Sequence, residues 1–308
     1  MTDAADDTED ARKRDISGYV LLVLAVLFWS GNAIVGRAAA GADMPPLGLN
    51  FWRWATALVV FLTFFGRATW RQRHAILANL KFLVPFCAVS VVGFNSLFYL
   101  ALQSTTALQA SLIQSVLPVL VLLLGLVVLR TPISVRQGWG VVFSIFGAAL
   151  IVIRGDVAVI ATLELNTGDA WALAAVSVWA LQAFLMRWKP KEIGIMPFMT
   201  SLAIIGVIIM APLYAWETMT VRPMPLNGTS ALYILYVGII ASFLGTTAWN
   251  EGTYRAGAAQ AGYFGNLYPI FAGVLAIILL GEDPRWYHAA GAAAVIAGIW
   301  MATARKNA

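Results

Sequence analysis

The stretch ALQASLIQSVLPVLVLLLGLVVL occupies residues 107–129 and runs for 23 residues without a charged side chain. At a rise of about 1.5 Å per residue, it is long enough to cross the roughly 30 Å hydrocarbon core of a bilayer. Lipid offers no water to satisfy the backbone, so a segment that crosses it must be helical. The stretch therefore predicts a transmembrane helix.

Nine further apolar segments lie along the chain. Together with the first they predict ten spans, over residues 17–38, 47–66, 81–102, 107–129, 137–153, 169–188, 195–215, 230–250, 258–280 and 287–304. The composition agrees, because 60% of the residues are hydrophobic and only 11% are charged, whereas a soluble domain has about 25% charged residues. We expect an all-α integral membrane protein and exclude a soluble one.

The opening stretch has a second copy in the chain. Residues 258–282, AAQAGYFGNLYPIFAGVLAIILLGE, match residues 107–129 at a shift of 151 residues, and residues 168–187 match residues 18–37 at a shift of 150. The identical pairs include Gly18/Gly168, Trp29/Trp179, Pro118/Pro269, Gly140/Gly291 and Gly147/Gly298. Such a series at a nearly constant offset indicates an internal repeat.

Each repeat holds five spans, an odd number, so the second repeat enters the membrane from the opposite side. We expect a disordered cytoplasmic tail over residues 1–16, a first five-helix repeat over 17–155 and a second over 168–305. Inverted repeats are typical of secondary transporters, whose binding site lies near the midplane where the repeats meet. This pattern predicts a central cavity between the two repeats.

The basic residues are distributed unequally across the predicted spans. Fifteen of the 20 Lys and Arg residues fall on one side and four on the other, which leaves Arg53 inside a span. Because cytoplasmic loops carry the excess of Lys and Arg, both termini are expected in the cytoplasm of a bacterial inner membrane. The net charge of +5 is thus explained by topology, and no nucleic-acid partner is expected.

Polar and aromatic side chains recur at helical spacing inside the spans, and many pair between the repeats. Asn95 and Tyr99 share one helix face, and their counterparts at a shift of 151 are Thr246 and Asn250. Lipid penalises such groups, so they should face inward, either as hydrogen bonds between helices or as a cavity lining. We expect a substrate-binding cavity lined by Trp29, Asn32, Asn95, Tyr99, Gln114, Ser115, Trp179, Gln182, Asn250 and Asn266.

Two features suggest how the helices bend and pack. Pro118 and Pro269 sit near mid-span, and each removes one backbone hydrogen bond, which predicts either a gating hinge or a static kink. The repeated glycines of the fifth and tenth spans lie seven residues apart on one face. They suit close helix packing, which we expect within a monomer rather than between two copies.

Several of these motifs resemble those of a known family. The segment Phe51-Trp52-Arg53-Trp54 and the two stretches at 107–129 and 258–282, each followed by two spaced glycines, are similar to the EamA family of the drug/metabolite transporter superfamily. Within it, residues 248–252 (AWNEG) and Tyr268-Pro269 resemble the YddG-type exporters of aromatic and other neutral amino acids. The resemblance implies a transporter of small molecules without a cofactor.

The first repeat departs from the family pattern at one point. It has Arg130-Thr131 where the second repeat keeps the Gly281-Glu282 pair found in many repeats of this type. A role for such a glutamate that is shared by both repeats is therefore not expected.

The expected function is export of small neutral or zwitterionic metabolites, amino acids including aromatic ones, by alternating access. Export of other drugs or metabolites is the alternative. Extrusion of lipophilic cations would use a mid-membrane carboxylate, which the spans lack, and a sugar-phosphate carrier would need more basic residues than Arg53. A membrane enzyme is the least expected class, because His74, His288 and Cys87 provide neither a metal cluster nor a nucleophile–base pair.

Overall fold

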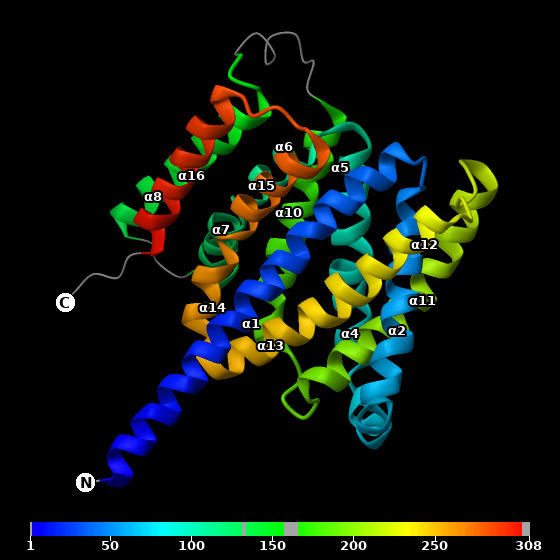
Figure 1. Ribbon diagram of the computed structural model, residues 1–308, viewed down its shortest axis with the longest axis vertical. Helices are drawn as coiled ribbons and strands as arrows, with labels where there is room; N and C mark the ends of the chain where they lie inside the picture. Colours follow the sequence, from blue (N-terminus) through cyan, green and yellow to red (C-terminus); the bar gives the residue numbers. More distant parts are fainter. Residues whose placement is uncertain (1, 131–133, 157–165, 304–308) are drawn as a thin grey trace.

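The computed structural model describes residues 2–130, 134–156 and 166–303, and all the regular elements in these residues are helical (Figure 1). Nine helical runs in the described part of the chain are long and apolar enough to cross a membrane. A further helix, α16, follows the ninth run at the place of the tenth expected span. The prediction of an all-α membrane protein is confirmed.

The first repeat consists of α1 (Thr2–Gly41), α2 (Pro46–Arg71), α3 (Arg73–Ala78), α4 (Leu80–Cys87), η1 (Ala88–Phe94), α5 (Asn95–Ser104), α6 (Ala107–Gln114), α7 (Leu117–Leu129) and α8 (Val135–Val152). The second consists of α10 (Thr167–Leu185), η2 (Met186–Trp188), α11 (Ile195–Thr220), α12 (Gly228–Leu235), η3 (Tyr236–Leu244), α13 (Gly245–Ala256), α14 (Ala258–Gly265), α15 (Tyr268–Leu280) and α16 (Trp286–Thr303).

The N-terminal segment differs from the expected disordered tail over residues 1–16. Helix α1 begins at Thr2 and continues without a break into the first span, so it projects beyond the other helices (Figure 1). The segment before Gly18 contains no Pro or Gly to interrupt a helix, although its commonest residue is Asp, which has low helix propensity. Residue 1 and the predicted repeat boundary at 305 lie outside the described residues.

The fourth and ninth spans are each broken at the same relative position. One break falls at Ser115, between α6 and α7, and the other at Asn266, between α14 and α15. Pro118 and Pro269 then occupy the first turn of the second half-helix, where a missing N–H leaves no hydrogen bond unmade. Both spans are therefore distorted near the predicted prolines, as breaks between two helices. The role of these prolines as hinges remains a prediction.

The third and eighth spans each contain a π-helical segment. In η1 and η3 the backbone hydrogen bonds skip one residue further than in an α-helix, and the two segments correspond at a shift of 150. Such segments are rare and are frequently found at functional sites. They turn the residues that follow, Asn95 in the first repeat and Gly245 in the second, relative to a regular helix.

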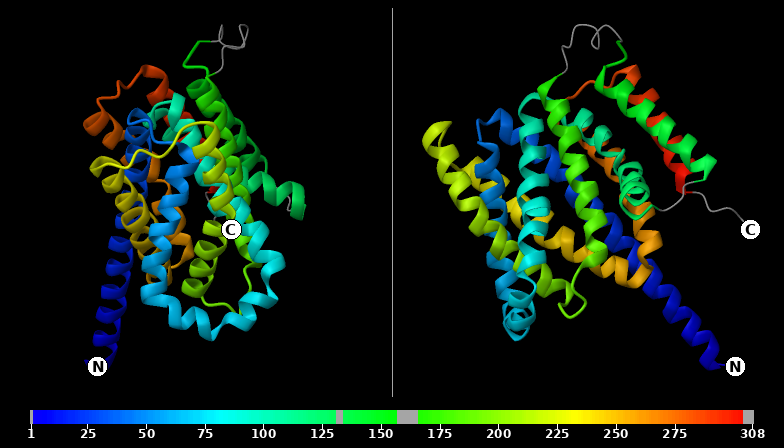
Figure 2. Two further views of the ribbon diagram at one scale, coloured as in Figure 1. Left: turned by 90° about the vertical axis from the view of Figure 1, so that its right-hand side faces the viewer. Right: turned by 180° about the vertical axis from the view of Figure 1, so that it is seen from behind.

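The two repeats interlock through pairs of helices. Helix α2 packs along α11, and α8 packs along α16, which form a separate pair at one side of the molecule (Figures 1 and 2). A Cβ atom added at Gly147 would lie 2.6 Å from the carbonyl oxygen of Gly291. The repeated glycines therefore join α8 to α16 within one chain.

The C-terminal ends of α7 and α15 share a left-handed cap. Arg130 has φ 53° and Gly281 has φ 64°, and both follow directly on the last helical residue. Glycine adopts this conformation without steric cost, whereas a residue with a Cβ atom is strained by roughly 1–2 kcal/mol. The departure from the Gly-Glu pair in the first repeat thus has a structural cost.

Candidate functional site

The centre of the candidate site is Arg53, which lies on α2 and is only 7% exposed. Arginine keeps its charge in proteins, and a buried charge must be paired or hydrogen-bonded to be tolerated. None of the ion pairs among the described residues includes Arg53. The guanidinium group is instead surrounded by neutral groups.

Four neutral side chains accept hydrogen bonds from Arg53. The Nη1 atom donates to Oδ1 of Asn95 at 2.7 Å, to the hydroxyl of Tyr99 at 3.1 Å and to Oδ1 of Asn32 at 3.2 Å. The Nε atom donates to Oγ of Ser242 at 2.6 Å. The Tyr99 hydroxyl also donates to Asn32 at 2.6 Å. These residues, which we call the Arg53 cluster, connect α1, α2, α5 and η3.

The π-helical segments orient two members of this cluster. The side-chain amide of Asn95 donates to the carbonyl oxygens of Ser90 and Val91, at 3.3 and 3.4 Å. The hydroxyl of Ser242 donates to the carbonyl oxygen of Val237, five residues earlier, at 2.7 Å. Since these donors are directed to the backbone, the Asn95 and Ser242 oxygens are left free to accept from Arg53.

Aromatic side chains form two groups on the spans that contribute to the site. Trp29 on α1 lies 5.1 Å from Trp249 on α13, measured between ring centroids. Trp179 on α10 lies 5.0 Å from Phe94 and meets Tyr268 edge-on at 6.2 Å. Each group combines rings from both repeats and could hold an apolar ligand surface.

Gln114 lies beside the aromatic group around Tyr268. The side chain of Tyr268 lies beside Ser111 and Gln114 and near Tyr99 and Arg53. Gln114 is 3% exposed, and its Nε2 atom has no hydrogen-bond partner among the described residues. The buried end of α6 therefore presents an amide donor near the Arg53 cluster.

The structure does not bring the remaining predicted residues into this cluster. Ser115 and Asn250 hydrogen-bond to the backbone of their own spans, at Leu112 and Thr246. Gln182 on α10 is half-buried, and Asn266 at the break between α14 and α15 is exposed. Ser115, Gln182, Asn250 and Asn266 are thus more exposed than the predicted residues that surround Arg53.

At one end of the molecule, carboxylates connect the ends of neighbouring helices. Glu217 of α11 accepts from the backbone N–H groups of Leu47 and Gly48, at 3.1 and 2.7 Å, and so caps α2. Glu282 accepts from Ala107 and Leu108, both at 2.8 Å, and caps α6. A carboxylate at a helix N-terminus is stabilised by the unpaired N–H groups and by the helix dipole.

A third carboxylate, Asp169, lies in the first turn of α10. It accepts from the hydroxyl of Thr105 at 2.5 Å and from Gln109 at 3.2 Å. The side chain of Gln109 also hydrogen-bonds with His288 at 3.0 Å. These contacts connect α6, α10 and α16 at the same end of the molecule as the two glutamate caps.

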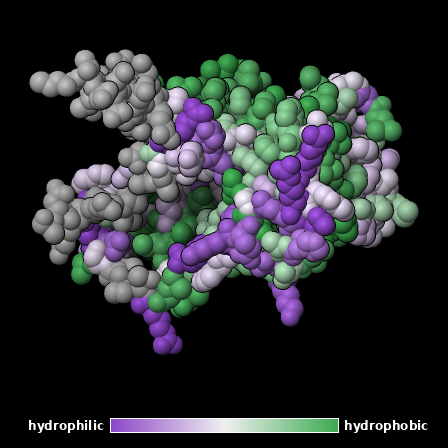
Figure 3. Space-filling view, turned by 90° about the horizontal axis from the view of Figure 1, so that it is seen from below, coloured by the Kyte–Doolittle hydropathy of each residue, from purple (hydrophilic) through white to green (hydrophobic). Residues whose placement is uncertain are grey.

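The face of the molecule at the opposite end is hollowed. Figure 3 shows this face from below, with a hollow whose described walls are largely hydrophobic and with hydrophilic side chains clustered beside it. The helices are thus tied together at one end and leave a depression at the other.

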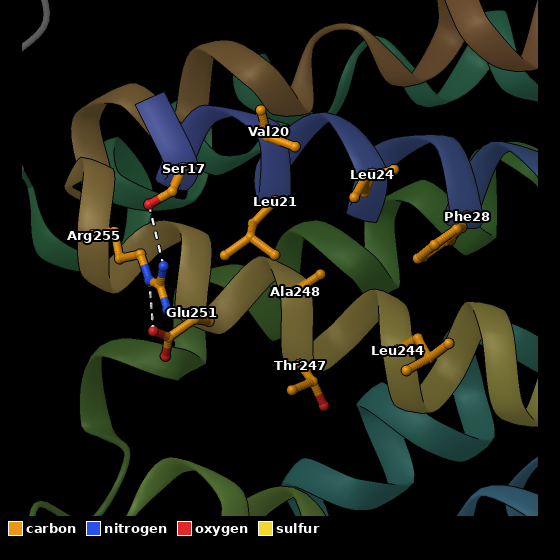
Figure 4. Close-up of a pocket in the computed structure, with 10 residues that line it drawn as sticks. All are labelled: Ser17, Val20, Leu21, Leu24, Phe28, Leu244, Thr247, Ala248, Glu251 and Arg255. Atoms are coloured by element: carbon orange, nitrogen blue, oxygen red, sulfur yellow. Dashed lines mark hydrogen bonds and ion pairs between the residues drawn. The ribbon is translucent and has the colours of Figure 1, made fainter. Parts of the chain in front are cut away.

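A separate groove of about 710 Å³ lies between α1 and α13 (Figure 4). Its walls are mostly apolar, including Val20, Leu24 and Phe28, and none of the ten predicted binding residues lines it. At its polar end Arg255 pairs with Glu251 at 2.7 Å. The carboxylate of Glu251 is therefore paired with a neighbouring cation.

The arrangement of two interlocked five-helix repeats agrees with a comparison with known families. The family described as the EamA-like transporter family matches residues 16–153 and 166–304. The chain belongs to this family. The two matched segments coincide with the two repeats, so the family resemblance expected from the sequence is confirmed.

Relatives of this EamA-like protein cover nearly its whole length. It is 24% identical over 287 residues to the uncharacterized transporter YyaM of Bacillus subtilis (92% of this chain, 93% of that one), and 29% identical over 300 residues to YdeK of the same organism (94% and 97%). A probable terminal-alkyne amino-acid exporter of Streptantibioticus cattleyicolor is 27% identical over 202 residues, or 64% of each chain.

A solved crystal structure shares the fold. It aligns with a TM-score of 0.60 over 95% of this chain and 96% of that one, at 17% sequence identity. The family and these relatives identify a multi-pass membrane transporter, which points away from an enzyme.

Sequence reasoning left Arg53, Ser242 and Tyr268 out of the predicted site. Arg53 carries the clearest signal, because an ionisable residue inside a span is a functional candidate in its own right. Ser242 has no such signal, since its role depends on the π-helical segment that presents it. Tyr268 precedes the repeated proline Pro269, which marks the break in the ninth span.

Proposed function

We propose that this EamA-like transporter exports small neutral or zwitterionic metabolites, with amino acids, including aromatic ones, as the main class. The observation that supports this most is the Arg53 cluster, in which amides and hydroxyls from α1, α2, α5 and η3 meet at a buried site. Such groups can bind a zwitterion, while the rings around Trp29 and Trp179 can pack against its side chain.

Two further observations support an amino acid. The relative from Streptantibioticus cattleyicolor is named as a probable amino-acid exporter. Residues 248–252 and Tyr268-Pro269 resemble those of YddG-type exporters, and this resemblance predicts the same substrate class. Transport of lipophilic cations is less favoured, because in the described spans the carboxylates lie near the helix ends and have partners.

The transport cycle is proposed to be alternating access, with the site near the midplane exposed to one side at a time. The carboxylate caps at the outer ends and the hollow at the opposite face support a state that opens to the inner side (Figure 3). We place the protein in a bacterial inner membrane, as a monomer with both termini in the cytoplasm, and Pro118 and Pro269 as the hinges.

Flux into liposomes tests this function. The purified protein is reconstituted and loaded with an unlabelled amino acid, and uptake of each member of a panel of radiolabelled amino acids is measured by exchange. We expect time-dependent uptake of at least one neutral amino acid that protein-free liposomes do not show. Uptake of lipophilic cations or sugar phosphates without any amino acid would contradict the proposal.

A further inference from the structure

Arg53 is a buried cation for which the described residues supply no negative charge. Its described hydrogen-bond partners are all neutral, and none of the ion pairs among the described residues includes it. Hydrogen bonding between packed helices would not by itself require a charged residue, because a neutral amide could accept and donate hydrogen bonds at the same place. A buried charge without a counter-charge is costly, and that cost is offset when a ligand supplies the anion.

Two hydrogen-bond donors at this site have no acceptor among the described residues. Among the described residues, Nε and Nη1 of Arg53 have acceptors, whereas Nη2 donates to none. The Nε2 atom of Gln114, beside Tyr268, is a second buried donor without a described partner. A ligand that satisfies both must offer acceptor oxygens, and a carboxylate offers two oxygens with about four acceptor positions.

We infer that Arg53 binds the carboxylate of the transported substrate, and that its Nη2 atom donates a hydrogen bond to a carboxylate oxygen. The Arg53 cluster fixes the guanidinium group from the Nε and Nη1 sides, so that its remaining edge is presented in one orientation. The inference rests on the proposed transport of small metabolites and narrows their chemistry to compounds that carry a carboxylate.

The surroundings of Arg53 define the rest of this substrate. Tyr268 lies near Arg53, and its ring meets that of Trp179 edge-on; Trp179 in turn lies 5.0 Å from Phe94, measured between ring centroids. A carboxylate held at Arg53 would therefore place its organic body against these rings. A monocarboxylate with an apolar or aromatic body fits, whereas a compound with the same body and a neutral amide lacks the charge that Arg53 requires.

The first experiment changes the ligand and leaves the protein intact. Thermal unfolding of the wild-type protein in detergent is measured with phenylalanine, leucine and butyrate, each matched by its amide, and the apparent affinities are compared. Since hydrogen bonds to a charged group contribute about 1.5–3 kcal/mol, we expect each acid that binds to do so about 10- to 100-fold more tightly than its amide.

The second experiment changes the protein. In Arg53→Gln the preference for the acid should fall to less than about threefold, whereas Arg53→Lys should keep part of it because the charge remains. Arg37→Gln is the matched control, because Arg37 donates to the carbonyl oxygen of Leu102 away from the cluster, and it should keep the full preference. If Arg53→Gln does not fold, the comparison of acids and amides on the wild-type protein still shows whether the site prefers a carboxylate.

The outcomes separate this inference from the proposed function. Equal binding of acids and amides, or an unchanged preference in Arg53→Gln, overturns the inference even if amino acids are transported. A preference that depends on Arg53 in a protein that transports no amino acid supports this role of Arg53 and overturns amino acids as the main class. Failure of every carboxylate to stabilise the wild type overturns this role directly.

Discussion

Oδ1 of Asn95 accepts a hydrogen bond from Nη1 of Arg53 over 2.7 Å, which connects the third span to the second inside the membrane. Asn95 can make this contact because its own amide group is directed to carbonyl oxygens of η1. Asn95 thus does not neutralise the charge of Arg53, but it accepts a hydrogen bond from the guanidinium group. The atoms that connect the two helices are therefore also atoms of the candidate binding site.

Asn95 and Asn250 should differ in their effect on transport, although they belong to matching polar stripes. Asn95→Ala removes an acceptor of a buried cation, which costs on the order of 1–3 kcal/mol. Asn250 bonds only to its own helix, at Thr246. We expect at least a tenfold loss of flux in liposomes for Asn95→Ala and less than a threefold loss for Asn250→Ala.

Val121→Ala on α7 is the control for this comparison and should leave flux unchanged. Equal losses at Asn95 and Asn250 would contradict the view that the Arg53 cluster, rather than the symmetric stripes, forms the site.

The cap on α6 should contribute to stability without being needed for coupling. Glu282→Gln removes the negative charge that faces two N–H groups, for which a loss of about 1 kcal/mol is expected. Glu251→Gln breaks an exposed pair with Arg255 and should cost less. Thermal unfolding in detergent measures both, and a larger loss for Glu251→Gln would oppose this explanation.

Flux should persist in both of these variants, because the described spans hold no carboxylate at mid-depth that could relay protons. A variant that folds and inserts but shows no flux at any pH would show that its carboxylate takes part in coupling.

Arg130 should be replaceable by glycine with a gain in stability. The residue has φ 53°, the conformation that Gly281 provides in the second repeat. Relief of the Cβ clash should increase the free energy of unfolding by about 1 kcal/mol. The reverse change, Gly281→Ala, should lower the melting temperature; if both changes are neutral, these caps carry no strain.

The contact between α8 and α16 should be sensitive to one methyl group. A Cβ atom at Gly147 would lie 2.6 Å from a backbone oxygen, whereas a Cβ atom at Gly138 on the same helix would meet no atom within 4 Å. Gly147→Ala should therefore destabilise the protein by about 1–3 kcal/mol. Gly138→Ala is the matched control and should be neutral or stabilising, as followed by thermal unfolding.

Both termini should lie in the cytoplasm. The excess of Lys and Arg on one side of the spans requires this orientation if the positive-inside rule holds. A reporter that fluoresces in the cytoplasm should be active when fused after Ala308, and a phosphatase that is active only in the periplasm should not. Phosphatase activity in that fusion would contradict the topology.

The apolar segments, the two repeats and the positions of both broken spans follow from the sequence alone. These features depend on local properties, because length and hydrophobicity decide whether a segment crosses lipid and a proline decides where a helix loses a hydrogen bond. The family resemblance rests on the same segments. The N-terminal extension of α1 was not predicted, because residues 3–15 are rich in Asp, which has low helix propensity.

The binding centre was decided by the tertiary structure. The repeat predicts symmetric half-sites, but the position that matches Arg53 at a shift of 150 is Ala203, so the second repeat has no matching charge. Asn32 and Asn95 were predicted from the stripes, whereas Ser242 faces Arg53 only because the π-helical segment turns the eighth span. A hydrogen bond depends on the three-dimensional position of both partners, and the spacing of residues along one helix specifies neither the neighbouring helix nor its rotation.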